Sequence, residues 1–447
     1  MTRPGRRVVV TGIGIVAPGG ADRGSFWDNA LACRSVTGPL PGHWSLYYQP
    51  VSTIWAPLQA IEWSLYPISR VESMQLDMTA KLAVAATVQA LHQAGFNLDC
   101  TDEKRNTFAL RGIAPERAAV FLGTGMGGIC SFAASEGHQL YAPLLQALKR
   151  EGLPASGFPF VRCAPRFNPF AVPMSMPNGA SAALGIKFSL SGTNRAIAGA
   201  CAAGTMAIGE AFEAIRRGSF DFALAGGVEY LADDYGGIFR AFDIARTLVS
   251  AGSDPDAANR PFDRKRSGFL FAEGGCAVLV LEDLDHARSR GARPVAEISG
   301  YAETFDAHSV MAIDPTAGRI EAMLKTLMDE VEITPADVDY INAHGTGTIA
   351  NDEIEAGLIN RMFGKKPVVN ATKSLIGHTI GAAGAIEAAV AALTIRDQKT
   401  HGCANLSDPV ADLNFAQESR NVEVGYAISQ SFAFGGHNAA LLLSRVA

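Results

Sequence analysis

The sequence predicts an α/β fold, because apolar strands and amphipathic helices alternate along most of the chain. The strands are nearly continuous apolar runs, such as 117–123 and 276–281. Such runs are typical of sheets that helices cover on both faces. The helices carry apolar residues at helical spacing, as in 78–94, which ends at Gly95.

The first strand is expected over 6–12, an apolar run closed by Gly12, and the last over 438–445. Further strands are expected over 117–123, 194–200, 220–226, 276–281, 295–302, 338–343, 367–372 and 424–429. Helices are expected over 78–94, 202–217, 283–290, 318–331 and 380–396.

Two stretches lack this regularity. Residues 39–70 are rich in Trp and Tyr, and they predict either an apolar flap on the core or a surface for a substrate or partner. Residues 129–175 contain several prolines and aromatic residues, so we expect an irregular excursion over a site or an interface.

Two segments share one plan, which predicts two similar halves with one site between them. In "NRAIAGACAAGTMAIGEAFEAI" and "KPVVNATKSLIGHTIGAAGAIEAAVAAL", an apolar strand leads to a reactive residue and then to a helix rich in Ala and Gly.

The composition excludes several classes of protein. Net charge is −6 and no run of Lys or Arg stands out, so we expect no nucleic-acid partner. No stretch of about 18 uninterrupted apolar residues occurs, so we expect no membrane insertion. Seven scattered cysteines without CxxC or zinc-finger spacing fit a reducing, cytoplasmic location rather than a disulfide framework or a metal site.

Cys201 is the first candidate catalytic residue. It follows a strand and precedes the helix 202–217, so it lies at a sharp turn and a helix N-terminus. The free N–H groups there can lower the pKa of a thiol and can hold an oxyanion. Alone, a free cysteine is more often a small buried apolar residue.

The segment "YINAHGTGTIANDEIE" (340–355) is the second candidate. The strand YINA delivers His344 at its carboxyl end, where open α/β folds place ligands. Gly345 and Gly347 let the chain turn, and Thr346 and Thr348 offer hydroxyls.

The segment "NATKSLIGHTIGAAGAIEAA" (370–389) carries Lys373, His378 and Glu387 among small and apolar residues. Burying them without a purpose would be costly. A Lys373–Glu387 pair could orient His378, or could be a purely structural ion pair.

Two glycine-rich segments complete the set. In "SQSFAFGGHNAALLL" (429–443), Phe432 and Phe434 precede Gly435 and Gly436, which predicts a tight turn whose N–H groups could complete an oxyanion hole. The segment "GTGMGG" (123–128) matches a dinucleotide-binding pattern only weakly, and we favour a loop lining the Cys201 cleft.

Together and in this order, these segments resemble the elongating β-ketoacyl-[acyl-carrier-protein] synthases, which belong to the thiolase-fold condensing enzymes. The resemblance runs from "RRVVVTGIGIVAP" to the C-terminus and includes 259–275 and 281–292. It is weakest over 39–70 and 129–175.

The resemblance implies a thiolase-like five-layered αβαβα fold with two duplicated halves. Residues 1–290 would form the half with the nucleophilic cysteine, and 291–447 the half with both histidines. It implies no metal and no organic cofactor, and substrates carried on the phosphopantetheine of acyl carrier protein. It also implies a homodimer, or a heterodimer with a chain-length-factor-like subunit, in which the strand before Cys201 pairs across the two-fold axis.

The resemblance also implies roles. Cys201 would carry the acyl group, and His344 and His378 would donate hydrogen bonds to the enolate formed when malonyl carrier protein loses CO2. The remaining roles are the following: Lys373 and its partner Glu387 set the electrostatics of the histidines, Thr346 and Thr348 bind pantetheine, Phe434 is the gate and gives an oxyanion-hole N–H, and Phe432, Gly435 and Gly436 complete the substrate site.

Three departures from the family pattern leave the pathway open. Ala433 and Ala272 stand where Gly is usual, and 306–318 lacks the usual Tyr-His-Met-Thr-Ser run. A pathway-specific type II polyketide or polyene ketosynthase therefore stands beside a fatty-acid enzyme. Less favoured are a biosynthetic thiolase, which would need a second cysteine near the C-terminus, a non-catalytic chain-length factor, and a cysteine hydrolase.

Overall fold

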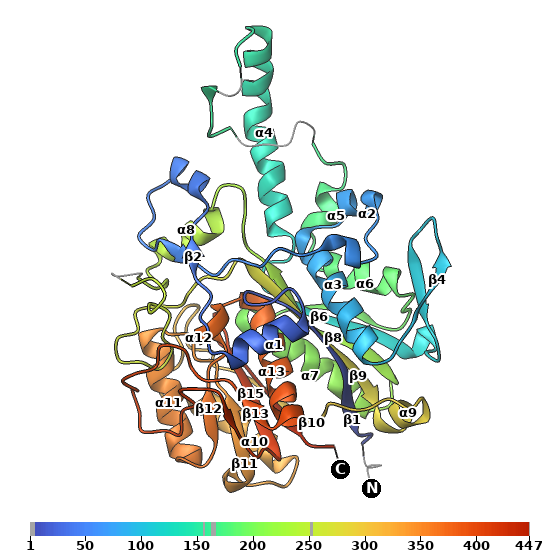
Figure 1. Ribbon diagram of the computed structural model, residues 1–447, viewed down its shortest axis with the longest axis vertical. Coiled ribbons are helices and arrows are strands. Elements are labelled where there is room, and N and C mark those ends of the chain that lie inside the picture. Colours follow the sequence, from blue (N-terminus) through green and yellow to red (C-terminus); the bar gives the residue numbers. More distant parts are fainter. Residues whose placement is uncertain (1–4, 155–156, 162–166, 251–253, 447) are drawn as a thin grey trace.

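The computed structural model describes residues 5–154, 157–161, 167–250 and 254–446 (Figure 1). Its centre is a ten-stranded sheet in the order β12-β11-β15-β16-β10-β1-β9-β8-β6-β7. These strands are β1 (Val8–Val16), β6 (Ala118–Thr124), β7 (Asn194–Ala198), β8 (Phe222–Tyr230), β9 (Gly274–Asp283), β10 (Ala296–Phe305), β11 (Val338–Asn342), β12 (Val368–Asn370), β15 (Tyr426–Phe432) and β16 (His437–Ser444).

The sheet repeats one topology on either side of the β1–β10 pair. The strands of each half can be numbered 1 to 5 in chain order. In the first half these are β1, β6, β7, β8 and β9, and across the sheet they lie in the spatial order 3-2-4-5-1. The second half has the same order, with β10, β11, β12, β15 and β16 as strands 1 to 5. The strand directions repeat as well: two parallel pairs are followed by two antiparallel pairs in each half. The predicted division into 1–290 and 291–447 falls between α9 (Leu284–Ser289) and β10, and it stays a prediction.

The five strands of each half form a half-sheet. Helices cover both faces of each half-sheet, which gives five layers. The outer helix α3 (Met78–Gln93) packs on β1 and β9, and α10 (Gly318–Asp329) packs on β10 and β16. Between the half-sheets lie α7 (Ala203–Arg216), on β6 and β8, and α13 (Ala383–Asp397), on β15. The α/β prediction is therefore confirmed.

The two middle helices approach each other closely at their N-terminal ends. A Cβ added to Gly204 of α7 would lie 2.7 Å from the Ala385 nitrogen, and one added to Gly384 of α13 would lie 2.1 Å from Thr205 Oγ1. Both positions therefore require glycine on steric grounds. This contact joins the two halves at the turns that carry the candidate site residues.

The remaining elements cover the sheet or connect its strands. The other helices are α1 (Arg23–Leu31), α2 (Arg70–Gln75), α4 (Ile129–Arg150), α5 (Ala171–Ser175), α6 (Gly179–Lys187), α8 (Gly237–Ile244), α11 (Ile349–Phe363) and α12 (Lys373–Ile376). Short 3-10 turns are η1 (Gly42–Leu46), η2 (Trp63–Leu65), η3 (Pro115–Arg117), η5 (Ala200–Ala202), η6 (Pro335–Asp337) and η7 (Ile380–Ala382), and the small strands are β2 (Gly38–Pro39), β3 (Ile54–Trp55), β4 (Leu98–Asp102), β5 (Thr107–Leu110), β13 (Lys399–Thr400) and β14 (Arg420–Asn421).

The expected strands and helices are confirmed, with ends that differ by a few residues, but the irregular excursion over 129–175 is wrong in part. Residues 129–150 form α4, which projects from the body of the molecule in Figure 1. Pro143 lies inside this helix, which is why its sequence read as irregular. Within the same stretch, 155–156 and 162–166 lie outside the described residues. The helices α1, α2, α5, α6, α8, α11 and α12 were not predicted.

The aromatic segment 39–70 packs on the core, as the flap interpretation predicted. Trp44 is 1% exposed and Trp55 is 6% exposed, and their rings meet edge to face with centroids 5.2 Å apart. The Trp44 indole donates a hydrogen bond to the Asp233 carbonyl. Both rings belong to the apolar cluster that also contains Cys201.

Among the described residues, no helix combines the length and the apolar character that crossing a bilayer requires.

Replacing Gly384 with alanine should destabilise the fold by about 1–3 kcal/mol, because the new methyl group overlaps Thr205 and forces α7 and α13 apart. Thermal unfolding followed by circular dichroism measures the change. The matched control is Gly357→Ala in α11, where a Cβ meets nothing within 4 Å and alanine favours the helix. Equal melting temperatures for Gly384→Ala and the unsubstituted protein would contradict the steric argument.

Candidate active site

The turn before α7 presents Cys201. The residue lies in η5 (Ala200–Ala202), directly before the helix, as predicted. Ala200 adopts a left-handed backbone conformation with φ of 44°, an uncommon one for a residue with a side chain. The chain thus reverses sharply between β7 and α7 and points the sulfur into a pocket, although Cys201 is only 3% exposed.

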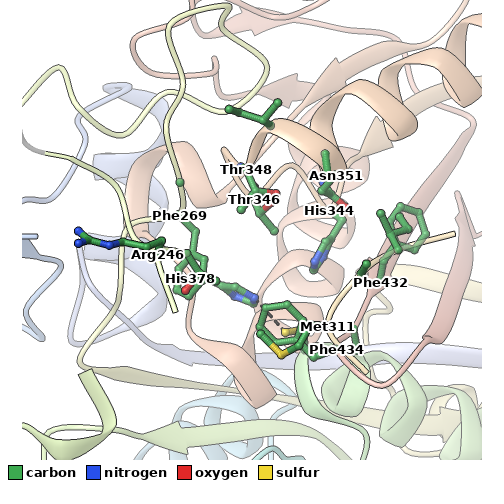
Figure 2. Close-up of a pocket in the computed structure, with 18 of the residues that line it drawn as sticks. Arg246, Phe269, Met311, His344, Thr346, Thr348, Asn351, His378, Phe432 and Phe434 are labelled. Atoms are coloured by element: carbon green, nitrogen blue, oxygen red, sulfur yellow. Dashed lines mark hydrogen bonds between the residues drawn. The ribbon is translucent and has the colours of Figure 1, made fainter. Parts of the chain in front are cut away.

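The pocket encloses about 350 Å³ between the two halves of the chain. Figure 2 shows the imidazoles of His344 and His378 both pointing into it. Its lining includes the following residues: Cys201, Arg246, Phe269, Asp306, Met311, His344, Thr346, Thr348, Ile349, Asn351, His378, Phe432, Ala433, Phe434 and Asn438.

His378 touches the sulfur directly, since its Nε2 lies 3.0 Å from Cys201 Sγ. On the other side of the ring, the Ile380 backbone N–H donates to Nδ1 at 3.2 Å. Because Nδ1 accepts this bond, the neutral ring carries its proton on Nε2. His378 therefore offers a hydrogen-bond donor to the pocket beside the sulfur.

His344 is oriented in the same sense by a different group. The Lys373 ammonium lies 3.2 Å from His344 Nδ1 and donates to the His344 carbonyl at 2.7 Å. Its third partner is Glu387 Oε1. Since a lysine ammonium only donates, His344 also carries its proton on Nε2. The two imidazole rings lie 5.6 Å apart, nearly perpendicular.

This arrangement corrects one expectation. Lys373 and Glu387 form the buried pair that the sequence predicted, but the pair orients His344 and not His378. The Ile380 N–H orients His378, and the sequence held no signal for a backbone group in that role.

Both histidines are neutral. Burial holds the pKa of His344 well below its usual range, and the Lys373 charge lowers it further. Burial and the Lys373 charge do the same to the pKa of His378. Two neutral imidazoles with N–H groups facing one pocket can stabilise a developing negative charge there.

The thiol differs from the expectation based on helix position alone. Burial raises the pKa of Cys201 to about 11, while the Lys373 charge and a hydrogen bond from the Phe434 backbone N–H oppose this rise. Burial in an apolar cluster therefore affects the pKa of Cys201 more than the helix N-terminus does, and the resting group is a thiol.

Phe434 lies in the turn that closes the β15–β16 hairpin. Gly435 and Gly436 both have φ of 88°, a conformation that glycine adopts without strain. The Gly435 N–H donates to the Val310 carbonyl, and the Asp306 N–H donates to the Gly436 carbonyl. The turn is thus held against the segment 306–313, part of which lines the pocket.

The remaining predicted residues fall into two groups. Thr346 and Thr348 line the pocket with their hydroxyl oxygens 2.9 Å apart, and Phe432 lies with its ring centroid 5.6 Å from that of His344. Lys373 and Glu387 lie behind the pocket wall, and Gly435 and Gly436 shape the turn without lining it.

The chain matches two descriptions of one family: "Beta-ketoacyl synthase, N-terminal domain" over 5–287 and "Beta-ketoacyl synthase, C-terminal domain" over 295–407. The "3-oxoacyl-[acyl-carrier-protein] synthase 2" of Coxiella burnetii is 34% identical and covers 99% of each chain. The protein of that name from Staphylococcus aureus strain N315 is also 34% identical, over 98% of each chain. The chain belongs to the beta-ketoacyl synthase family.

Solved structures agree with this assignment to the beta-ketoacyl synthases. A type II PKS acyl-carrier protein in complex with its ketosynthase bound to the hexaketide gives a TM-score of 0.81 at 26% identity, covering 99% of this chain and 100% of that one. The ishigamide ketosynthase/chain length factor gives the same values. A beta-ketoacyl synthase from Burkholderia phymatum STM815 gives 0.81 at 28% identity with the same coverage. The predicted family, thiolase-like fold and acyltransferase class are confirmed.

Several residues of this beta-ketoacyl synthase site were not predicted. Glu355 is buried and accepts hydrogen bonds from the His344 and Gly345 backbone N–H groups at 2.7 and 2.8 Å. Burial raises the pKa of this carboxyl to about 6. A glutamate eleven residues after the histidine in the same motif was the available signal. Phe269, whose ring lies 5.3 Å from that of His378, gave no signal.

Two expectations about other motifs are settled by position. The glycine-rich segment 123–128 does not line the pocket, so its prediction as a cleft loop is wrong for this cavity. Cys403, the last cysteine in the sequence, is buried and accepts a hydrogen bond from the Ala371 N–H outside the pocket, so it does not serve as the second cysteine that a thiolase would need. Within the described part of the chain, no group of three or more His, Cys, Asp or Glu side chains could hold a metal ion.

The departures from the family pattern have structural consequences. Ala433 keeps a negative φ, so alanine fits the backbone that glycine usually occupies there. Met311, Ala312 and Ile313, in the segment that lacks the usual Tyr-His-Met-Thr-Ser run, line the pocket and make this wall apolar.

The raised pKa of Cys201 predicts that its alkylation by iodoacetamide accelerates roughly tenfold per pH unit from pH 7 to pH 10, because the thiolate fraction grows that way below a pKa of about 11. Peptide mass spectrometry follows Cys201, and the exposed Cys100 reports reagent reactivity in the same sample. A rate that levels off near pH 8 would show instead that the helix start outweighs burial.

Proposed function

We propose that this protein catalyses the decarboxylative condensation of an acyl group held on Cys201 with malonyl-acyl carrier protein, giving 3-oxoacyl-acyl carrier protein. The observation that carries the proposal is the position of His378 Nε2, 3.0 Å from the Cys201 sulfur, with His344 beside it. One nucleophile and two neutral donors face one pocket that an acyl-thioester arm can enter.

In the first half-reaction, the Cys201 sulfur attacks the thioester of acyl carrier protein. A carbon–sulfur bond forms to Cys201, the bond to the carrier thiol breaks, and the proton of Cys201 passes to that leaving thiol. The negative charge on the tetrahedral oxygen rests on the backbone N–H groups of Cys201 and Phe434. The Lys373 charge assists because it lowers the pKa of the sulfur.

In the second half-reaction, malonyl carrier protein loses CO2 and leaves an enolate. The Nε2–H groups of His344 and His378 donate to the enolate oxygen, and their neutrality avoids protonating the carbon that must react. That carbon attacks the acyl-Cys201 carbonyl, the carbon–sulfur bond breaks, and the released thiolate takes a proton from solvent.

The substrates reach the pocket on phosphopantetheine. Thr346 and Thr348 bind this arm, and the apolar wall of Met311 and Phe432 contacts its carbon chain. No cofactor takes part in this scheme. The proposed partners are acyl carrier protein and a second thiolase-fold subunit, either another copy or a chain-length-factor-like relative. Support for the second subunit comes from β7, which ends the sheet and leaves one edge without a strand.

A pathway-specific polyketide ketosynthase is the second candidate. One solved relative is a type II PKS ketosynthase and another is a ketosynthase/chain length factor, and this chain has the apolar segment 306–313 and the projecting α4. Mass spectrometry of products from defined acyl primers and malonyl carrier protein separates the candidates. A single condensation that awaits reduction favours fatty-acid synthesis, and unreduced products of several condensations favour the polyketide pathway.

Cys201→Ala should abolish acyl transfer from acyl carrier protein, because it removes the sulfur that forms the new bond. Intact-mass measurement detects the acyl-enzyme. His344→Ala and His378→Ala should each slow CO2 release from malonyl carrier protein by about 10²–10³-fold. His92→Ala on the exposed side of α3 is the control. Acylation that persists in Cys201→Ala would refute the assignment of the nucleophile.

Phe434→Ala should weaken the order of substrate loading, because the ring acts as a gate between the two half-reactions. The test is CO2 release from malonyl carrier protein before and after acylation of Cys201. We expect the unsubstituted protein to release CO2 mainly after acylation, and the variant to release it in both states. An unchanged ratio would argue against a gate at this position.

A further inference from the structure

Glu229 is a buried carboxylate that the reaction scheme does not use. It lies near the end of β8, is 0% exposed, and accepts four hydrogen bonds. Its Oε1 accepts from the Thr124 hydroxyl at 3.2 Å and the Met126 N–H at 3.1 Å. Its Oε2 accepts from the Gly125 N–H at 2.6 Å and the Gly381 N–H at 3.1 Å.

These four donors come from both halves of the chain. Thr124, Gly125 and Met126 belong to the glycine-rich segment 123–128 at the end of β6, and Gly381 belongs to η7 before α13. The two backbones touch here, since a Cβ added to Gly381 would lie 2.3 Å from the Gly125 nitrogen. The glycine-rich segment therefore serves a carboxylate rather than a nucleotide.

The turn that Glu229 holds contains a strained residue. Ile380 has φ of 49°, a left-handed conformation that is a genuine outlier for a β-branched side chain. Such a residue persists only where its surroundings over-determine it. Its own N–H is the group that donates to His378 Nδ1. Glu229 is therefore connected to His378 in three steps: the hydrogen bond from the Gly381 N–H to Glu229, the backbone between Gly381 and Ile380, and the hydrogen bond from the Ile380 N–H to His378.

We propose that Glu229 is a positioning residue that fixes the Nε2–H tautomer of His378 by holding the strained turn at Ile380. This inference rests on the proposed function and extends it. Without the anchor, the Ile380 N–H turns away from Nδ1, which can then carry the proton. His378 Nε2 becomes an acceptor toward Cys201, and the enolate loses one of its two donors.

The two half-reactions should then respond differently. Decarboxylation needs the Nε2–H donor, whereas acyl transfer needs the sulfur to lose its proton and does not need that donor. A loss of stability alone would slow both half-reactions together. Their ratio therefore separates a positioning role from a merely structural one.

The test is Glu229→Gln. The amide NH2 group of glutamine then replaces one carboxylate oxygen, so two of the four donors face a group that donates instead of one that accepts. We expect CO2 release from malonyl carrier protein to fall by about 10²-fold, since a histidine in the wrong tautomer fails as a donor. We expect acylation of Cys201, measured by intact mass, to change by less than about 3-fold. The ¹⁵N resonances of His378 in histidine-labelled protein should show Nδ1 protonated. The control is Glu273→Gln, a half-buried carboxylate that accepts from the Leu58 N–H outside the pocket.

Equal losses in both half-reactions, no loss in either, or an unchanged His378 tautomer would overturn the inference. If Glu229→Gln does not fold, as judged by circular dichroism, Glu229→Asp replaces it; its shorter side chain cannot reach Gly125 and Gly381 together, and the same split should appear. An unsubstituted protein that neither acylates Cys201 nor releases CO2 would instead refute the proposed function.

Discussion

The close approach of α7 and α13 is the constraint on which the site depends. Cys201 precedes α7 and His378 precedes α13, so the sulfur and the imidazole meet only because the helix starts nearly touch at Gly204 and Gly384. The same duplicated topology produces both helices. Each is entered through a left-handed residue, Ala200 or Ile380. Equivalent turns in the two halves therefore carry different side chains, a thiol in the first half and an imidazole in the second.

A buried ammonium gives this geometry its electrostatics. Lys373 is 2% exposed, and its three protons are matched by Glu387 Oε1, His344 Nδ1 and the His344 carbonyl. A buried charge is tolerated only when it is paired in this way. The charge lowers the pKa of both histidines and of Cys201. Burial keeps the imidazoles neutral, and this one cation adds to that effect and eases the ionisation of the thiol.

Residue types and local pattern predicted the strands, the helix starts and the side chains that meet in the pocket, because each depends on neighbours in the sequence. The contact of Lys373 with His344, rather than with His378, was not predictable. It depends on how two turns of the second half pack against each other. The pKa of Cys201 was mispredicted for the same reason: the helix start is local, whereas the apolar cluster around the sulfur comes from distant segments. The helix α4 was missed because Pro143 lies within it.

The two segments with the weakest family resemblance meet in space. Tyr47, from the aromatic segment, packs edge to face on Tyr235 and donates to the Phe160 carbonyl, and Tyr141 of α4 also packs on Tyr235. In the same aromatic segment, Trp44 and Trp55 pack edge to face within the apolar cluster that contains Cys201. The candidate catalytic groups are fixed by hydrogen bonds within the duplicated core, and the two tryptophans pack in the apolar cluster that contains the Cys201 side chain. Neither 39–70 nor the described part of 129–175 lines the pocket, so these two segments can vary without changing the residues that face the histidines.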